Sequence, residues 1–116
     1  MALEEWNKRL TEHFDALARD RQNNPLFALE HGLASAELLA LQNELRIHIR
    51  SSAPARNHQF TWVVYAAELG YGYAGDEYWQ TFEEKTPGWT LNGTRGWIRD
   101  AFVAFQERFS GAKPSG

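Results

Sequence analysis

The sequence predicts an all-α fold, a compact bundle of four to five helices around an aromatic-rich core. Apolar residues recur at spacings of three and four along most of the chain, which is the period of a helix with one buried face. Short stretches rich in Gly, Pro, Ser and Asn, which favour turns, separate these periodic segments. Thirteen of the sixteen aromatic residues lie between Phe60 and Phe109, and each large ring buries roughly 150–250 Å². We therefore expect half of the chain to form an aromatic core or to present a ring-rich surface.

The first two predicted helices come from the N-terminal half of the chain. The first spans residues 3–20, and its apolar face is Leu3, Trp6, Leu10, Phe14 and Leu17. It ends at residues 22–25, because the residue before a proline disfavours helix. Ser35 is the expected N-cap of the second helix, over residues 36–50. The apolar face of this second helix is Leu38, Leu41, Leu45 and Ile49.

The C-terminal half predicts two or three further helices. Residues 59–69 are apolar almost all round, which indicates a central helix, with a buried strand as the alternative. Asp76 is the expected N-cap of a short helix over residues 77–85, and a last helix runs from residue 94 or 95 to 109, with Gly111 as its C-cap. The predicted centre of the core is Trp62, Tyr65, Trp79, Phe82, Ile98, Phe102 and Phe105.

Length and composition fit one helical domain over residues 1–110 of the 116-residue chain. Residues 111–116 have the composition of a linker or disordered tail, so we expect a domain cut from a longer protein, with a frayed natural terminus as the alternative. The chain is 43% hydrophobic and 23% charged, which is typical of globular domains. No apolar run reaches about 18 residues, and the acidic start does not resemble a signal peptide. We expect a cytoplasmic protein without a membrane partner.

Few residue patterns in the chain favour catalysis or cofactor binding. The absence of cysteine excludes disulfides, thiolate metal sites and a cysteine nucleophile. Residues 70–75 read G-x-G-x-x-G, but they follow a predicted helix, and Asp76 and Glu77 would place negative charge where a phosphate must lie. Glu30 and His31 could serve acid–base chemistry, but the four histidines lack the spacing that puts two metal ligands on one helix face. We expect no active site, metal or cofactor in this chain.

A candidate interaction surface lies near the start of the last helix. Its residues are Trp89, Arg95, Trp97 and Arg99. Arg and Trp are enriched in the residues that contribute most to protein interfaces. In the alternative interpretation, Trp97 packs inward beside Ile98 and both arginines are solvated or paired.

A local basic strip at the end of the second helix and in the loop after it suggests a different partner. It contains Arg46, Arg50, Arg56 and His58. Such a strip could contact the phosphates of a nucleic acid, although cations near a helix C-terminus also suit the helix dipole. The net charge of −3 gives no global reason to expect nucleic acid.

Glu68 is the one acidic residue in the most apolar segment. Burial of an unpaired charge is costly, so Glu68 needs a partner. We expect a structural ion pair between Glu68 and either Arg95 or Arg99.

Two strings of the sequence carry a resemblance to known proteins. They are Phe-Ala-Leu-Glu-His-Gly-Leu at 27–33 and Gly-Asp-Glu-Tyr-Trp-Gln-Thr-Phe-Glu at 75–83. They resemble the N-terminal part of large, poorly characterised bacterial multidomain proteins of the kind found in defence gene clusters. The resemblance covers most of residues 25–116 and implies a bacterial cytoplasmic setting, but no activity, substrate or site residues.

Taken together, these patterns predict a non-catalytic docking domain. Its partner would be the rest of a longer parent chain, another protein or a second copy of itself. The alternative is a nucleic-acid-binding module that uses the basic strip for phosphate contacts and surface aromatics for base stacking.

Overall fold

The computed structural model describes residues 2–21, 26–70 and 75–109, and every regular element in these ranges is a helix. The elements are α1 (Leu3–Arg21), η1 (Ala28–Glu30), α2 (Ser35–Ile49), η2 (Arg56–His58), α3 (Gln59–Gly70), α4 (Gly75–Lys85), α5 (Trp89–Asn92) and α6 (Arg95–Phe109), where η denotes a 3₁₀ helix. The predicted all-α class is therefore confirmed. None of the described helices is both long and apolar enough to cross a membrane.

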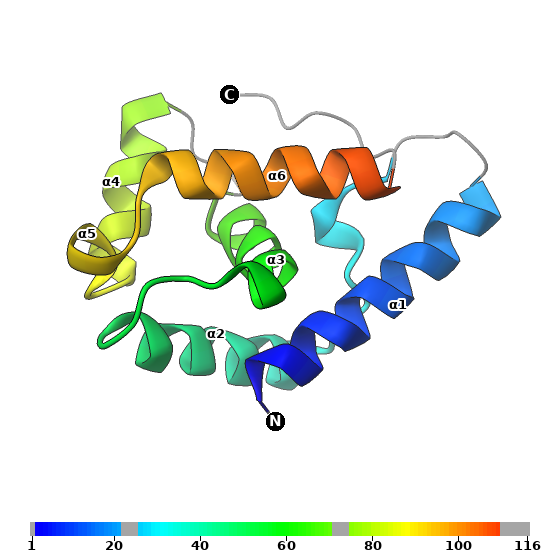
Figure 1. Ribbon diagram of the computed structural model, residues 1–116, viewed down its shortest axis with the longest axis horizontal. Coiled ribbons are helices and arrows are strands. Elements are labelled where there is room, and N and C mark those ends of the chain that lie inside the picture. Colours follow the sequence, from blue (N-terminus) through cyan, green and yellow to red (C-terminus); the bar gives the residue numbers. More distant parts are fainter. Residues whose placement is uncertain (1, 22–25, 71–74, 110–116) are drawn as a thin grey trace.

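Helix α3 forms the centre of the fold. In Figure 1 it lies between α6, which crosses the top of the view, and α2, which lies along the bottom. Its residues from Phe60 to Ala66 are all buried, and it contacts α1, α2, α4 and α6. An almost uniformly apolar helix is stable where other helices cover it on every side. The segment is thus the predicted central helix, and the alternative of a strand is wrong.

The aromatic residues pack mainly inward, in two neighbouring clusters. One cluster joins α1, α3 and α6 through Phe14, Phe60, Phe105 and Phe109, whose ring centroids lie 4.9–6.1 Å apart. The other joins α3, α4 and α5 through Trp62, Tyr65, Phe82 and Trp89, at 5.0–5.6 Å. Most of these pairs are edge-to-face, an arrangement that ring quadrupoles favour. The aromatic density of the sequence therefore indicates a core rather than a ring-rich surface.

The predicted core is largely correct, and the helix boundaries differ by one or two residues. Trp79 and Phe102, predicted at the centre, are only partly buried and pack at its edge. Helix α2 begins at Ser35, so Ala34 rather than Ser35 is its N-cap residue, and Asp76 lies inside α4 rather than before it. The predicted C-cap, Gly111, lies outside the described residues. The short helix α5 was not predicted, because four residues are too few to show a period.

The C-terminal end of α2 is held by contacts from elements distant in sequence. The Asn92 side chain donates a hydrogen bond to the carbonyl oxygen of Ile49 at 2.7 Å. Gly88, with φ of 97°, lies so close that a Cβ at this position would stand 2.9 Å from the same oxygen. The Arg46 Nε donates to the Tyr65 hydroxyl at 3.1 Å. These contacts fix which face of α2 points into the core.

Candidate functional site

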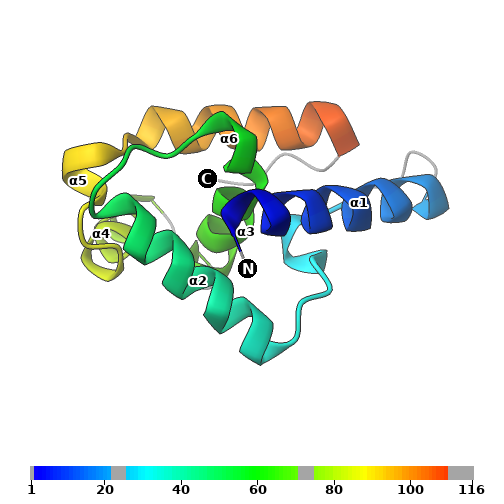
Figure 2. The same ribbon diagram turned by 60° about the horizontal axis from the view of Figure 1, so that its bottom comes forward.

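The most distinctive surface of the molecule is the side of α2 that points away from the core, which we call the outer face. It consists of Ala36, Leu39, Ala40, Asn43, Glu44 and Ile47, all of them exposed. Leu39 is 55% exposed and Ile47 is 59% exposed, so both branched side chains are mostly in contact with water. In Figure 2, α2 runs along the lower left edge of the molecule with α3 behind it.

Helix α2 has two apolar faces because apolar residues occur in pairs or near-pairs along it. Leu41, Leu45 and Ile49 are fully buried against the core. At 100° per residue, Ala36 and Ile47 lie roughly opposite Leu45 on the helix. One core can cover one face of a surface helix, so the second apolar face remains exposed.

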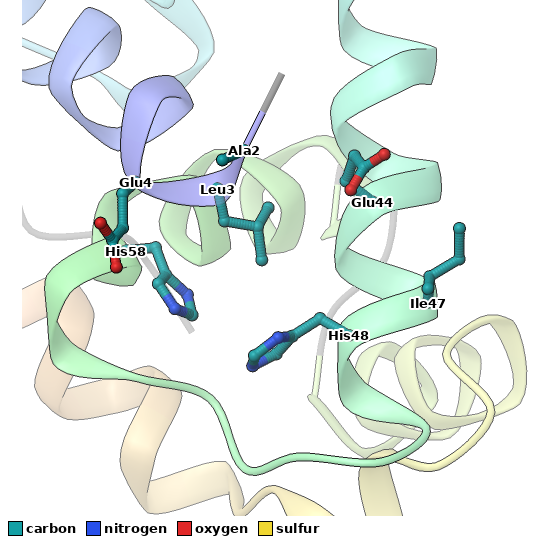
Figure 3. Close-up of a pocket in the computed structure, with 7 residues that line it drawn as sticks. All are labelled: Ala2, Leu3, Glu4, Glu44, Ile47, His48 and His58. Carbon is teal, nitrogen blue, oxygen red and sulfur yellow. The ribbon is translucent and has the colours of Figure 1, made fainter.

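A shallow pocket adjoins the C-terminal half of the outer face (Figure 3). It has a volume of about 410 Å³, and its lining residues come from Ala2, from the start of α1, from α2 and from η2. These residues are Ala2, Leu3, Glu4, Glu44, Ile47, His48 and His58. Ile47 and Glu44 therefore belong both to the outer face and to the wall of the pocket.

Two imidazoles meet inside this pocket, where Figure 3 shows them on opposite walls. The rings of His48 and His58 make an edge-to-face contact with centroids 5.0 Å apart. Burial lowers the pKa of His58, and the nearby His48 lowers it further, whereas the Glu4 carboxylate acts in the opposite direction. The buried Nδ1 of His58 has no hydrogen-bond partner in the described structure. A neutral His58 is therefore the form that the fold favours.

The polar groups of the pocket do not form a catalytic arrangement. His48 Nε2 is bonded to the carbonyl oxygen of Ala53 at 3.1 Å, and Glu4 accepts a hydrogen bond from Asn57 at 2.7 Å. Nowhere in residues 2–21, 26–70 and 75–109 do three His, Asp or Glu side chains come close enough to hold a metal ion. The pocket is best described as an open, partly apolar depression beside the outer face.

The basic strip is divided by the fold. Arg46 is half-buried, donates to Tyr65 and lies 5.6 Å from the centroid of that ring. His58 is 6% exposed and lines the pocket. Arg50 and Arg56 are exposed, so two of the four predicted phosphate contacts remain at the surface. The other two positions have structural contacts instead.

The predicted interaction residues near the start of α6 are also separated, and the prediction for Trp89 is wrong. Trp89 is 1% exposed, with its ring 5.1 Å from Trp62 and 5.0 Å from Phe82. The turn at Gly88 leads the chain back into the short helix α5, which places Trp89 in the core. A residue so deeply buried cannot anchor a partner.

Two of the remaining members, Arg95 and Arg99, lie at the surface beside Trp79. The guanidinium groups of Arg95 and Arg99 lie 5.5 Å and 5.8 Å from the centroid of the Trp79 ring. Arg95 also pairs with Glu83 at 2.9 Å. Trp97 is half-buried and packs against the core. The arginines therefore cover the edge of the core with contacts made inside the chain.

Glu68 is paired as expected, but the predicted partner is wrong. Its Oε1 lies 2.6 Å from His31 Nε2, and the carboxylate side chain is 27% exposed. The end of α3 packs against η1, which brings Glu68 to His31, whereas Arg95 turns toward α4. His31 Nδ1 accepts the N–H of Leu33 at 2.9 Å, so the ring proton lies on Nε2 and is donated to Glu68. Both ring nitrogens are occupied, and the pair fastens the loop after η1 to α3.

Glu30 also has a structural role, next to His31. Its carboxylate pairs with Arg21 at the end of α1 and accepts the N–H of Phe27 at 2.8 Å. The hydrogen bond from Arg21 is the main reason why the pKa of Glu30 lies below its ordinary value. Its carbonyl oxygen is bonded to His13 Nε2 at 2.7 Å. Glu30 and His31 thus connect α1, η1 and α3 and do not form a reactive dyad.

The outer face of α2 was missed by the sequence analysis, although the sequence contains a signal for it. The pairs Leu38–Leu39 and Ala40–Leu41 and the triplet Ile47–Ile49 put apolar residues on both sides of one helix. Both sides have the three-and-four spacing of a helix face, but only Leu38, Leu41, Leu45 and Ile49 were considered in the prediction.

No protein-family model matches the chain, and neither the curated proteins nor the solved structures include a match.

Proposed function

We propose that this protein is a non-catalytic docking domain that binds a protein surface through the outer face of α2. The observation that carries the proposal is the second apolar face of a helix whose first apolar face is already buried. Single exposed apolar residues are common on protein surfaces, but several exposed apolar residues on one side of a helix, here Ala36, Leu39, Ala40 and Ile47, are typical of a contact site.

The energetics of this face support binding. Full burial of an exposed Leu or Ile side chain is worth about 1.5–3 kcal/mol, so burial of the exposed halves of Leu39 and Ile47 contributes about 2–3 kcal/mol together. Ala36 and Ala40 add little area but allow a partner helix to approach closely. Glu44 and the pocket beside Ile47 form a more polar edge, as the rim of an interface does.

The second candidate, a nucleic-acid-binding module, has less support. Arg46 and His58 make contacts inside the fold, so only Arg50 and Arg56 of the basic strip are exposed at the surface. With two phosphate contacts, the logarithm of the binding constant should fall with the logarithm of the salt concentration with a slope of about −2, which is typical of weak binding. Fluorescence anisotropy of labelled oligonucleotides at two salt concentrations tests this candidate directly.

Site-specific photocrosslinking in cells tests the docking proposal. A benzophenone amino acid replaces Asn43 at the middle of the outer face, and the matched control replaces Val103, which is 45% exposed on α6. These helices lie on opposite sides of the molecule in Figure 1. We expect a discrete adduct from position 43 that position 103 does not form, and mass spectrometry of the adduct names the partner. No adduct from position 43, or the same adducts from both positions, would refute the proposal.

A further inference from the structure

We propose that the partner of the outer face is a second copy of this chain, with the two α2 helices packed antiparallel about a two-fold axis beside Asn43. This inference rests on the proposed function and specifies its partner. It follows from the positions of the large and small residues on the exposed side of α2.

The C-terminal half of the outer face has one protruding apolar side chain, and the N-terminal half has a recess that matches it. Ile47, 59% exposed, stands alone in the C-terminal half of the face. In the N-terminal half, four residues enclose a position on the helix surface: Ala36, Leu39, Ala40 and Asn43. Their spacing of i, i+3, i+4 and i+7 is that of the hole which receives one knob in knobs-into-holes packing. The two alanines leave space at this hole for a branched side chain.

The distances along the helix make this match self-complementary. Ile47 lies four residues after Asn43, and the centre of the hole lies three to four residues before it. Each interval is about 6 Å at 1.5 Å per residue. If Asn43 lies beside its own copy in an antiparallel pair, Ile47 of each chain is level with the hole of the other. Both holes are then filled by one symmetric contact, as an isologous dimer requires.

Charge favours the antiparallel over the parallel arrangement. Glu37 in the first turn of α2 is paired with Arg9, and Arg46 in its last turn is engaged with Tyr65, so the charges that count are those of the helix dipoles. An antiparallel pair brings the positive end of one helix dipole to the negative end of the other, and a parallel pair brings like ends together. A parallel pair would also set Ile47 level with Ile47 and leave both holes empty.

Glu44 gives the proposed dimer a specific salt dependence. It is exposed, has no ion-pair partner within the described ranges, and lies at the flank of the outer face one residue from the axis. The two Glu44 carboxylates therefore repel each other across the axis. Because added salt screens this repulsion, a higher salt concentration should strengthen the dimer. Added salt would instead weaken binding to phosphates.

Cysteine crosslinking tests the geometry, since the chain contains no cysteine of its own. A disulfide needs Cα atoms about 4.4–6.8 Å apart. Asn43→Cys protein should link to itself. Leu39→Cys and Ile47→Cys proteins should not, because equivalent positions lie about 12 Å apart along the axis, but the two should link to each other when mixed. Self-linking of all three variants would indicate a parallel pair and overturn the proposal.

Sedimentation of the full chain tests the association itself. One helix from each copy buries less than the roughly 1,200–2,000 Å² of a stable interface, so we expect a weak dimer that forms between about 10 µM and 1 mM. Ile47→Asp should abolish it without changing the helical circular dichroism spectrum. Glu44→Gln should tighten it by up to about fivefold, as expected from removal of one exposed like-charge contact. A chain that stays monomeric at about 1 mM overturns the dimer.

The two proposals fail in different ways. If the purified chain is monomeric and the crosslinker at position 43 captures a different protein in cells, the dimer is refuted and the docking function stands. If position 43 captures nothing and the chain is monomeric, both are refuted. If position 43 captures the chain itself and Asn43→Cys links to itself, both stand.

Discussion

Truncation of two residues on opposite faces of α2 should have very different effects on stability. Leu45 is completely buried, and removal of its side chain beyond Cβ leaves a cavity in the core, at a cost of about 3 kcal/mol within the usual 2–5 kcal/mol for Leu→Ala. Ile47 is more than half exposed, so Ile47→Ala removes little buried apolar area. The higher helix propensity of alanine stabilises the folded chain by about 0.4 kcal/mol in the opposite direction. We expect Ile47→Ala to remain within about 0.5 kcal/mol of the parent chain.

Urea unfolding followed by circular dichroism measures this contrast. With a slope of about 1.5 kcal/mol per M, Leu45→Ala should lower the urea midpoint by about 2 M and Ile47→Ala by less than about 0.4 M. A concentration of about 2 µM keeps the proposed weak dimer dissociated. Equal losses for the two variants would show that the outer face is packed in the folded chain. A harmless Leu45→Ala would show that α2 is rotated relative to the described structure, and either result removes the basis of the docking proposal.

Three further variants test other contacts by urea unfolding. Tyr65→Phe removes the buried hydroxyl that contacts Thr86 at 2.7 Å and Arg46 at 3.1 Å, and it should cost about 1–2 kcal/mol; no loss would contradict this buried network. Gly88→Ala places a Cβ at φ of 97° against the end of α2 and should cost about 2–3 kcal/mol, whereas an unchanged midpoint would contradict the turn. Because burial lowers the pKa of His58, the unfolded chain binds a proton there at a higher pH than the folded chain does. Stability should therefore fall as the pH decreases below about 6.5, and His58→Phe should reduce this fall between pH 7.5 and 5.5; the same fall in both proteins would contradict it.

The helices could be predicted because their signal is local. The spacing of Leu3, Trp6, Leu10 and Phe14 places them on one face of any helix that forms there, whatever packs against it, and all four are buried. The uniformly apolar segment from Phe60 to Ala66 likewise indicates a helix that is covered on all sides. The short helix α5 could not be found in this way.

The partners of individual side chains could not be predicted, since they depend on how helices distant in sequence meet. The apolar neighbours of Glu68 in the sequence predicted that its carboxylate has a partner in the folded chain. That the partner is His31 rather than Arg95 follows from the packing of η1 against the end of α3. Trp89 and Trp97 are the same residue type and lie only eight positions apart. The turn at Gly88 nevertheless places Trp89 in the core, whereas Trp97 lies at the edge of the core.

The sequence by itself determined the all-α class, the five longer helices and most of the core, because hydrophobic period and turn residues act over a few positions. The spacing of Leu41, Leu45 and Ile49 also predicted the buried face of α2, but only the tertiary structure decided that no other described element covers the opposite face. Leu39 and Ile47 are as apolar as Leu41 and Ile49, so residue type alone does not separate the two pairs. The separation arises because Asn92, Gly88 and Tyr65 hold α2 in one orientation, in which the core covers a single face. The other face remains available to a partner.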